Sequence, residues 1–331
     1  MSNRIASLPR FAELAVAFCV SGILWQGELL AQAWPAKTIR VIVPFTPGGP
    51  TDAVARVMAQ HLTAALGQQV AVENRPGAGG TIGAAGAAKS PADGYTLFFA
   101  TTSTFSIAPT LYSNPGFDPL KSFAPISQLV TAPFLVVVHP AVPARTLQEL
   151  TRLARAKPGE LNFGSGGSGT PLHIAGEMFK TAAGVNLVHV PYKGVAGAVV
   201  DLYTGRLQVM FEQLFPLQQH IRSGRLRPLA VAAARRHPQL PDLPTSAEAG
   251  LPGYEVTAWF GLAAPAGIAV DIVRRLNAEV LKALQTREVR DAFSNQGLAP
   301  AGSSPEEFAA FIAAEADKWS RAVKSSGAKV D

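Results

Sequence analysis

The feature that most constrains this chain is a unit of apolar strand, glycine-rich loop and helix that recurs between residues 39 and 263. In its first copy, the β-branched run 39–43 precedes a turn-rich loop at 44–49. A helix then starts at Pro50 and presents apolar residues at helical spacing until Gly67 stops it. This alternation predicts mostly parallel strands with helices on both faces of the sheet.

The units form two series, so we expect two α/β domains of roughly 100 and 120 residues. The expected strands lie at 39–43, 70–72, 96–100, 134–138, 161–163, 187–190, 207–211, 226–233 and 256–263. The expected helices include 50–66, 81–89, 147–156, 171–183, 214–223, 270–285 and 305–325.

The first thirty-three residues have the pattern of an export signal. Arg4 and Arg10 form a basic start, the run 14–24 is apolar, and Ala31-Gln-Ala33 is a small-x-small cleavage site. The apolar run is shorter than the roughly 20 residues that span a bilayer. We therefore predict cleavage after Ala33 and a periplasmic mature protein.

Composition excludes several classes of protein. With 48% hydrophobic and 16% charged residues, the chain is not intrinsically disordered. The one cysteine, Cys19, lies in the predicted signal, which excludes a disulfide framework and a four-thiolate zinc site. The net charge of +6 favours anionic small ligands, and with export we expect no nucleic-acid partner.

The loops of both series suit an anionic ligand. Each ends where a helix begins, so free backbone N–H groups and the positive end of the helix dipole point out of it. Glycine allows close approach, and serine and threonine add hydroxyl donors. Ligands of such sheets bind at the carboxyl ends of the strands. We therefore expect a small carboxylate in a cleft between two lobes.

Other chemistries fit less well. The run 164–169 matches G-x-G-x-x-G, but no acid ends the next strand, as a dinucleotide site requires. Ser165 or Ser168 could pair with His173 in a hydrolase, but no G-x-S-x-G elbow is present. The six histidines have no metal-ligand spacing. We expect no catalytic residue, cofactor or metal.

Several single residues allow two interpretations. Asp52 could return a hydrogen bond to the helix cap or bind a ligand ammonium or hydroxyl group. Arg75 could staple its own loop or face the cleft, and Tyr192 could line the core or the pocket. Glu212 follows a strand end and would repel an anion unless paired with a cation or a ligand hydroxyl. The pair 259–260 is expected at the domain junction.

The segment 34–52 (WPAKTIRVIVPFTPGGPTD) resembles the start of mature Bug-type receptors, the extracytoplasmic solute-binding proteins of tripartite tricarboxylate transporters. Five more segments are similar to that family: 72–80 (VENRPGAGG), 93–97 (DGYTL), 188–194 (VHVPYKG), 240–245 (LPDLPT) and 247–253 (AEAGLPG). The resemblance covers nearly all of residues 34–331, and the motifs together are specific.

The resemblance implies a two-lobed periplasmic-binding-protein (Venus flytrap) fold with a hinge of two crossing strands. Lobe one would comprise 34–133 plus 257–331, with the tail helices returning to it, and lobe two would comprise 134–256. In this family the ligand carboxylate is held mostly by loop backbone and hydroxyl groups, often through water.

Residues carried over from the family motifs form the predicted ligand site. They are Phe45, Thr46, Gly48, Gly49, Asp52, Thr101, Ser103, Thr104, Ser165, Ser168, Thr170, His173, Tyr192, Lys193 and Glu212. Glu212-Gln213 stands where the family often has Asp-Asn, and Pro50 and Pro171 replace commoner residues.

The expected function is capture of a small carboxylate by a monomeric periplasmic receptor that delivers it to the membrane permease of a tripartite transporter. A receptor that presents its ligand to a sensor kinase is one alternative, and an exported hydrolase is another. The sequence leaves open which carboxylate binds and whether it also carries an amine or an aromatic ring.

Overall fold

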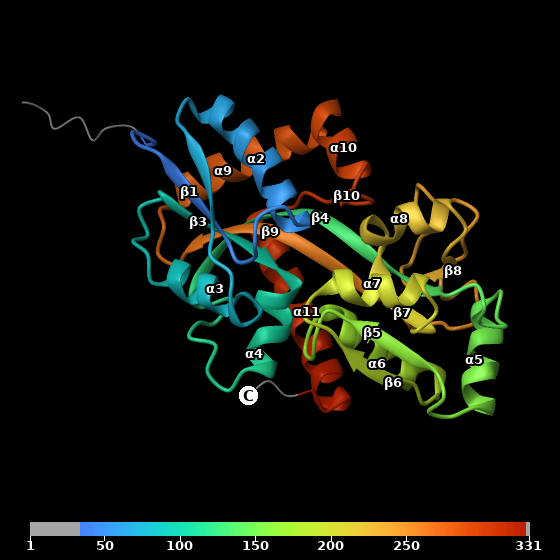
Figure 1. Cartoon of the computed structure of the whole chain (residues 1–331). Coiled ribbons are helices and arrows are strands. Elements are labelled where there is room, and N and C mark those ends of the chain that lie inside the picture. Colours follow the sequence, from blue (N-terminus) through green and yellow to red (C-terminus); the bar gives the residue numbers. More distant parts are fainter. Residues whose placement is uncertain (1–33, 329–331) are drawn as a thin grey trace, which may run out of the picture. The chain divides into compact units, whose positions relative to one another are not determined.

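The computed structural model describes residues 34–328, and the chain from Lys37 onward forms one compact unit (Figure 1). The predicted export signal at 1–33 lies outside the described residues, so its cleavage site stays a prediction. Within the described part, no helix is long and apolar enough to cross a membrane.

The strands of the described residues join in one ten-stranded sheet with the order β2-β1-β3-β9-β4-β7-β5-β6, and β8 and β10 pair with β4. The strands are β1 (Ile39–Val43), β2 (Val70–Asn74), β3 (Thr96–Thr101), β4 (Phe123–Val138), β5 (Asn162–Ser165), β6 (Val188–Pro191), β7 (Val209–Gln213), β8 (Arg227–Val231), β9 (Thr257–Pro265) and β10 (Ala299–Pro300). The groups β2-β1-β3 and β7-β5-β6 are parallel, as expected from the recurring units.

Helices follow most strands. The longer ones are α2 (Pro50–Leu66), α3 (Thr81–Ala88), α5 (Leu147–Ala156), α6 (Pro171–Ala183), α7 (Val195–Tyr203), α8 (Leu214–Arg222), α9 (Val270–Gln285), α10 (Arg287–Ser294) and α11 (Pro305–Ser326). Short turns are η1 (Ala78–Gly80), η2 (Thr102–Ile107) and α4 (Ala108–Leu111). The expected loop after the third strand is thus helical, because Thr101 caps a π-helical turn there.

Two antiparallel strands, β4 and β9, connect the two parallel groups (Figure 1). Strand β4 is longer than the expected 134–138, because its first half pairs with β9 and its second half pairs with β7 and β8. Pro133 lies opposite Thr257, the first residue of β9. The proposed lobe boundaries at 133 and 257 therefore meet at one point of the sheet.

An aromatic core packs the sheet of the first group against α3, η2 and α11. Trp259 is fully buried, and its ring lies 5.5 Å from that of Phe308 and 6.4 Å from that of Phe105. Trp259 therefore anchors β9 in this core, whereas the neighbouring Phe260 lies on the opposite face, 5.6 Å from Phe99 between ring centroids. The tail helix α11 returns to the first group of strands. Helix α11 also packs against α6 and lies between the two groups in Figure 1.

Side-chain alternation along β7 separates the two faces of the second group. Phe211 lies 5.1 Å from Phe179 of α6 and 5.7 Å from Phe163 of β5, measured between ring centroids. Neighbours of Phe211 along the strand point to the opposite face, where α7 and α8 pack. Glu212 is such a neighbour.

Candidate ligand site

The loop between β1 and α2 is held by the buried carboxylate of Asp52. Its Oδ2 accepts hydrogen bonds from the Gly48 backbone N–H at 3.0 Å and from Arg56 Nε at 2.9 Å. Asn74 Nδ2 donates to Oδ1 at 3.0 Å and also to the carbonyl oxygen of Phe45. Burial alone would raise the pKa of Asp52, but these hydrogen bonds outweigh it and lower the pKa. The carboxylate therefore braces the loop.

The end of β3 is braced by threonines. Thr101 and Thr104 form a reciprocal capping box at the start of η2, and both are buried. Thr102 Oγ1 accepts from the backbone N–H of Trp259 at 2.8 Å, which ties this turn to β9. Ser103 is partly exposed between them. The threonine hydroxyls thus shape the turn that presents Ser103.

In the second group of strands, Ser165, the last residue of β5, organises the glycine–serine loop at residues 166–170. Its Oγ donates to the Gly167 carbonyl oxygen at 3.0 Å, accepts from the Gly167 N–H at 3.1 Å, and lies 2.7 Å from His189 Nε2. Thr170 Oγ1 donates to the same carbonyl oxygen at 2.7 Å. Gly167 and Gly169 have φ of 134° and 76°, values that a side chain would strain.

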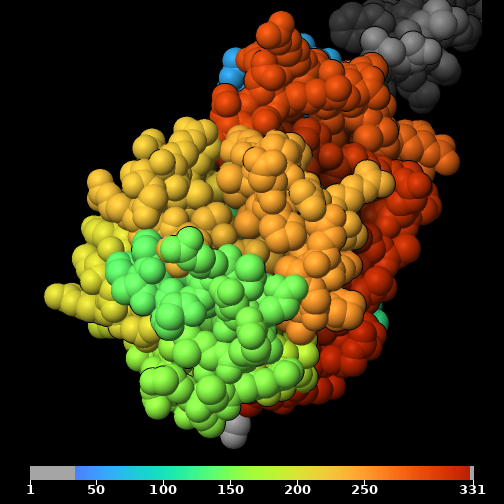
Figure 2. All heavy atoms as spheres, turned by 90° about the vertical axis from the view of Figure 1, so that its right-hand side faces the viewer, coloured from blue at the N-terminus to red at the C-terminus, as the bar shows by residue number. Residues whose placement is uncertain are grey.

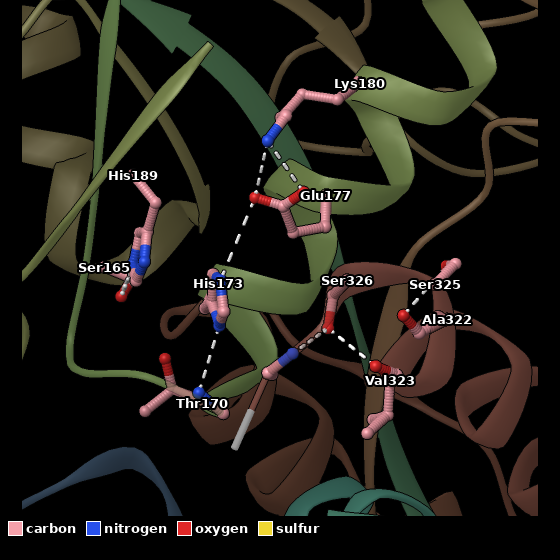
Figure 3. A network of polar contacts seen from close by, with 12 residues as sticks. Ser165, Thr170, His173, Glu177, Lys180, His189, Ala322, Val323, Ser325 and Ser326 are labelled. Atoms are coloured by element: carbon pink, nitrogen blue, oxygen red, sulfur yellow. Dashed lines mark hydrogen bonds and ion pairs between the residues drawn. The ribbon is translucent and has the colours of Figure 1, made fainter. Parts of the chain in front are cut away.

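Two stacked imidazoles lie beneath this loop (Figure 3). The rings of His173 and His189 are 3.8 Å apart, and His173 Nδ1 accepts the backbone N–H of Gly169 at 3.0 Å. Burial lowers the pKa of both histidines, to about 4 for His189, where His173 and Lys180 add to the effect. Glu177 opposes the shift at His173. Both rings are therefore neutral at pH 7.

The loop after β6 lies against the glycine–serine loop. The backbone N–H of Gly194 donates to the Gly166 carbonyl oxygen at 3.1 Å. Tyr192 donates its hydroxyl to Asp201 at 2.7 Å, and burial followed by this bond raises the pKa of Tyr192 to about 12. Lys193 is exposed.

Contacts between loops bring these segments together. A Cβ atom placed on Gly80 would lie 2.7 Å from Thr104 Cγ2 and 3.5 Å from the Phe45 ring. A Cβ atom on Gly169 would lie 2.4 Å from Leu111 Cδ2, so the glycine–serine loop touches α4 of the first group. Loops that are far apart in the sequence therefore meet, as the proposed site requires.

Helix starts near these loops differ from those elsewhere. Helices α2, α3, α6, α7 and α8, which follow parallel strands or their loops, begin without a side-chain cap. Helices α5, α10 and α11 are capped by Thr146, Thr286 and Ser304. Helix α9 is also uncapped, and it carries Asp271 in its first turn as α2 carries Asp52. Uncapped starts leave N–H donors for an anion.

The predicted site residues divide into two sets. In the first set, polar side-chain atoms are used inside the fold; it comprises Asp52, Thr101, Thr104, Ser165, Thr170, His173, Tyr192 and, through one oxygen, Glu212. In the second set, no side-chain hydrogen bond forms within residues 34–328; it comprises Thr46, Ser103, Ser168 and Lys193. Phe45, Gly48 and Gly49 contribute a ring and backbone.

Sequence reasoning missed His189, although it stands in the segment 188–194. Its bond to Ser165 replaces the conceivable pair of that serine with His173. Ser165 is fully buried, and no carboxylate pairs with either ring nitrogen of His189 within the described residues. The pair therefore lacks the exposure and the acid of a hydrolase triad. Residues 34–328 also contain no group of side chains suited to a metal ion.

Arg75 staples its own segment, because its guanidinium pairs with Glu73 at 2.7 Å.

A separate cavity of about 430 Å³ contains none of the predicted site residues. Pro133, the loop 237–239 and the segment 290–300 line it, and Figure 2 shows gold and orange-red segments meeting on that side. There, buried His237 Nε2 lies 3.1 Å from the Gly297 carbonyl oxygen.

A comparison with protein families gives the class. Residues 54–328 match the tripartite tricarboxylate transporter family receptor, so the chain belongs to this family. Members of the family are solute receptors and not enzymes, so the prediction that this protein has no catalytic activity is confirmed. The predicted two-lobed fold and the Bug-type resemblance are confirmed by the same comparisons.

Similar proteins cover almost the whole chain. Protein BugT of Bordetella pertussis is 38% identical over 320 residues, which are 96% of this chain and 98% of BugT. The structure of R. palustris Rpa4515 with adipate is 37% identical, with a TM-score of 0.80, and the match covers 89% and 99% of the chains. MatC from Rhodopseudomonas palustris with bound malate is 33% identical, with a TM-score of 0.76 and coverage of 88% and 100%.

Proposed function

We propose that the protein is a periplasmic receptor that binds a small carboxylate between lobe one (34–133 plus 257–331) and lobe two (134–256). The observation that carries the proposal is the set of uncapped helix starts beside loops that touch each other. Each start contributes about 0.3–1 kcal/mol toward an anion, and each charge-assisted hydrogen bond about 1.5–3 kcal/mol. Relatives with adipate and malate bound support the same ligand class.

The free hydroxyls of Thr46, Ser103 and Ser168 and the exposed ammonium of Lys193 are the proposed direct contacts. The buried residues around them hold the loops in place. Ligand contacts on both lobes shift the population toward a closed form, since only that form satisfies them all. The strands β4 and β9 act as the hinge.

The closed, monomeric receptor delivers its ligand to the permease of a tripartite transporter, after cleavage of the export signal behind Ala33. The family description supports this partner. Uptake of the ligand by cells that lack the receptor tests delivery, and N-terminal sequencing of the exported protein tests cleavage.

Ligand binding is tested with residues 34–331 in a thermal-shift screen of mono-, di- and tricarboxylates, amino acids and aromatic acids, followed by calorimetry. We expect stabilisation by at least one carboxylate, because a ligand that binds only the folded state raises its stability. A flat response to every carboxylate would contradict the proposal.

A further inference from the structure

Glu212 is a buried carboxyl group with one unused oxygen. Its side chain is 3% exposed, Oε1 accepts the Gln213 N–H at 2.7 Å, and Oε2 is buried without a hydrogen-bond partner. Native proteins rarely keep such an atom, and an unsatisfied buried group is often functional. Glu212 therefore requires an explanation beyond packing.

The register of the sheet places Glu212 at the proposed site. Met210 pairs with Gly164 of β5. Extended by two residues, this parallel register puts Glu212 level with Gly166, the first residue after β5. On its other side, Glu212 pairs with Leu135 in the second half of β4, close to the proposed hinge. It points to the face covered by α7 and α8, both of which start without caps.

No cation compensates a charge at Glu212. Facing segments of β4 and β5 carry no ionisable side chain. The ionisable groups of the surrounding helices are His173, Glu177 and Lys180 of α6, Asp201 and Tyr203 of α7, and His220 and Arg222 of α8. None of them pairs with Glu212 within residues 34–328; Glu177 pairs with Lys180, and Asp201 pairs with Arg206.

An isolated carboxyl group in this position holds its proton. Burial raises the pKa of Glu212 to about 8, and the Gln213 N–H opposes only part of the rise. The neutral acid then presents an O–H at Oε2 that donates to nothing. This removes the repulsion that a bare carboxylate would exert on an anionic ligand.

We propose that Glu212 keeps its proton at neutral pH and donates it in a hydrogen bond to an oxygen atom of the bound carboxylate. The inference rests on the proposed function and narrows the ligand class. A ligand ammonium group also donates, so it would need Glu212 ionised. The site therefore favours carboxylates that carry no ammonium group at this end.

The sign of the pH dependence tests the proposal. Calorimetry of residues 34–331 with succinate, malate and adipate between pH 6 and pH 9.5 should show affinity falling roughly tenfold from pH 7 to pH 9. The Glu212→Gln variant keeps a donor and should lose this dependence. The amino terminus of the chain also titrates near pH 8. Because the variant keeps this group, a pH dependence that the variant loses comes from Glu212. Aspartate is succinate with an added ammonium group, so its affinity at pH 7 tests the predicted preference for carboxylates without such a group.

Glu315→Gln is the matched control, because Glu315 is also buried but its oxygens accept from Lys318 and Trp319. The affinity of Glu315→Gln for the dicarboxylates should depend on pH as it does in the unmodified receptor. An affinity for the dicarboxylates that is flat to pH 9, a tenfold fall that persists in Glu212→Gln, or tighter binding of aspartate than of succinate at pH 7 would each overturn the proposal.

A measurement without ligand covers the case in which Glu212→Gln does not fold. Carbon-13 NMR of glutamate carboxyl groups in the receptor should show one resonance that titrates near pH 8. Its absence would overturn the proposal whatever the ligand. If no carboxylate binds at any pH, the proposed function and the ligand contact both fail, while this resonance still reports whether Glu212 is protonated.

Discussion

The two proposed lobes hold their candidate ligand loops by different chemistry. In lobe one, the ionised carboxylate of Asp52 collects N–H donors from Gly48, Arg56 and Asn74. In lobe two, the neutral imidazoles of His173 and His189 accept or share hydrogen bonds under the glycine–serine loop. One loop depends on a charge being present and the other on a charge being absent.

This difference predicts unequal responses to mutation and to acid. The partners of Asp52 are close to solvent, since Gly48 and Arg56 are exposed and can exchange the carboxylate for water. His173 is buried, and its partner Gly169 is buried too. Loss of the imidazole therefore leaves a donor that water does not reach, which is the costlier case.

The largest effect is expected for His173→Ala, at about 3 kcal/mol of unfolding free energy. The substitution creates a cavity beside His189 and leaves the Gly169 N–H unpaired. Urea unfolding measures the change. His139→Ala is the control, because partly buried His139 accepts a backbone N–H in the same way, through a hydrogen bond that is open to solvent. Equal losses in both variants would show that burial of the loop contact is unimportant.

Asp52→Ala should cost less, about 2 kcal/mol, because the released donors of lobe one can be hydrated. The control is Asp291→Ala. Asp291 also makes an ion pair four residues apart, with Arg287, but both side chains are exposed and the pair should contribute almost nothing. Denaturant midpoints of the two variants decide whether the loop network or the ion pair itself stabilises the fold.

Acid should weaken lobe two before lobe one. The pKa of His189 in the folded state is about 4, below the ordinary 6.5, so its stabilisation is present above pH 6.5 and is lost as pH falls toward 4. A loss of about 1 kcal/mol is expected from pH 6.5 to pH 5.5. Asp52, whose pKa is lowered, keeps its contribution until pH falls below the ordinary aspartate value.

The measurement is urea unfolding across this pH range for the receptor and for His189→Gln, which keeps a hydrogen-bonding group without titrating. A flatter profile is expected for the variant. If both profiles fall equally between pH 6.5 and 5.5, another histidine such as His237, whose pKa is also lowered by burial, carries the effect.

Much of this architecture followed from local patterns. The strand at 39–43 and the helix that Gly67 ends were predictable because apolar spacing and a left-handed cap are properties of short segments. The length of β4 was not predictable, because its first half is stabilised by pairing with β9, more than a hundred residues away in the chain. Pairing between distant strands cannot be predicted from the spacing of residues within a short segment.

The site shows the same limit. The glycine, serine and threonine content of the loops predicted which segments contact a ligand, a prediction that stays open, but it did not show which hydroxyls form hydrogen bonds inside the fold. Ser165 and Ser168 are equivalent by type and spacing, and only the fold shows that Ser165 is bonded to His189 while Ser168 is exposed. The proposed neutral state of Glu212 likewise depends on the burial of its side chain and on the absence of a paired cation, which the local sequence does not show.

That pair of serines provides the smallest predicted change in stability. Ser165→Ala should cost about 1 kcal/mol, because the Gly167 N–H and the His189 ring lose a partner. Ser168→Ala should change stability by less than about 0.5 kcal/mol, as for exposed positions in general. If its hydroxyl contacts ligand, however, Ser168→Ala should weaken carboxylate binding roughly three- to tenfold, the equivalent of one neutral hydrogen bond. Thermal unfolding and calorimetry on the two variants separate the roles, and equal loss of affinity without loss of stability in both would mean that the buried serine also reaches the ligand.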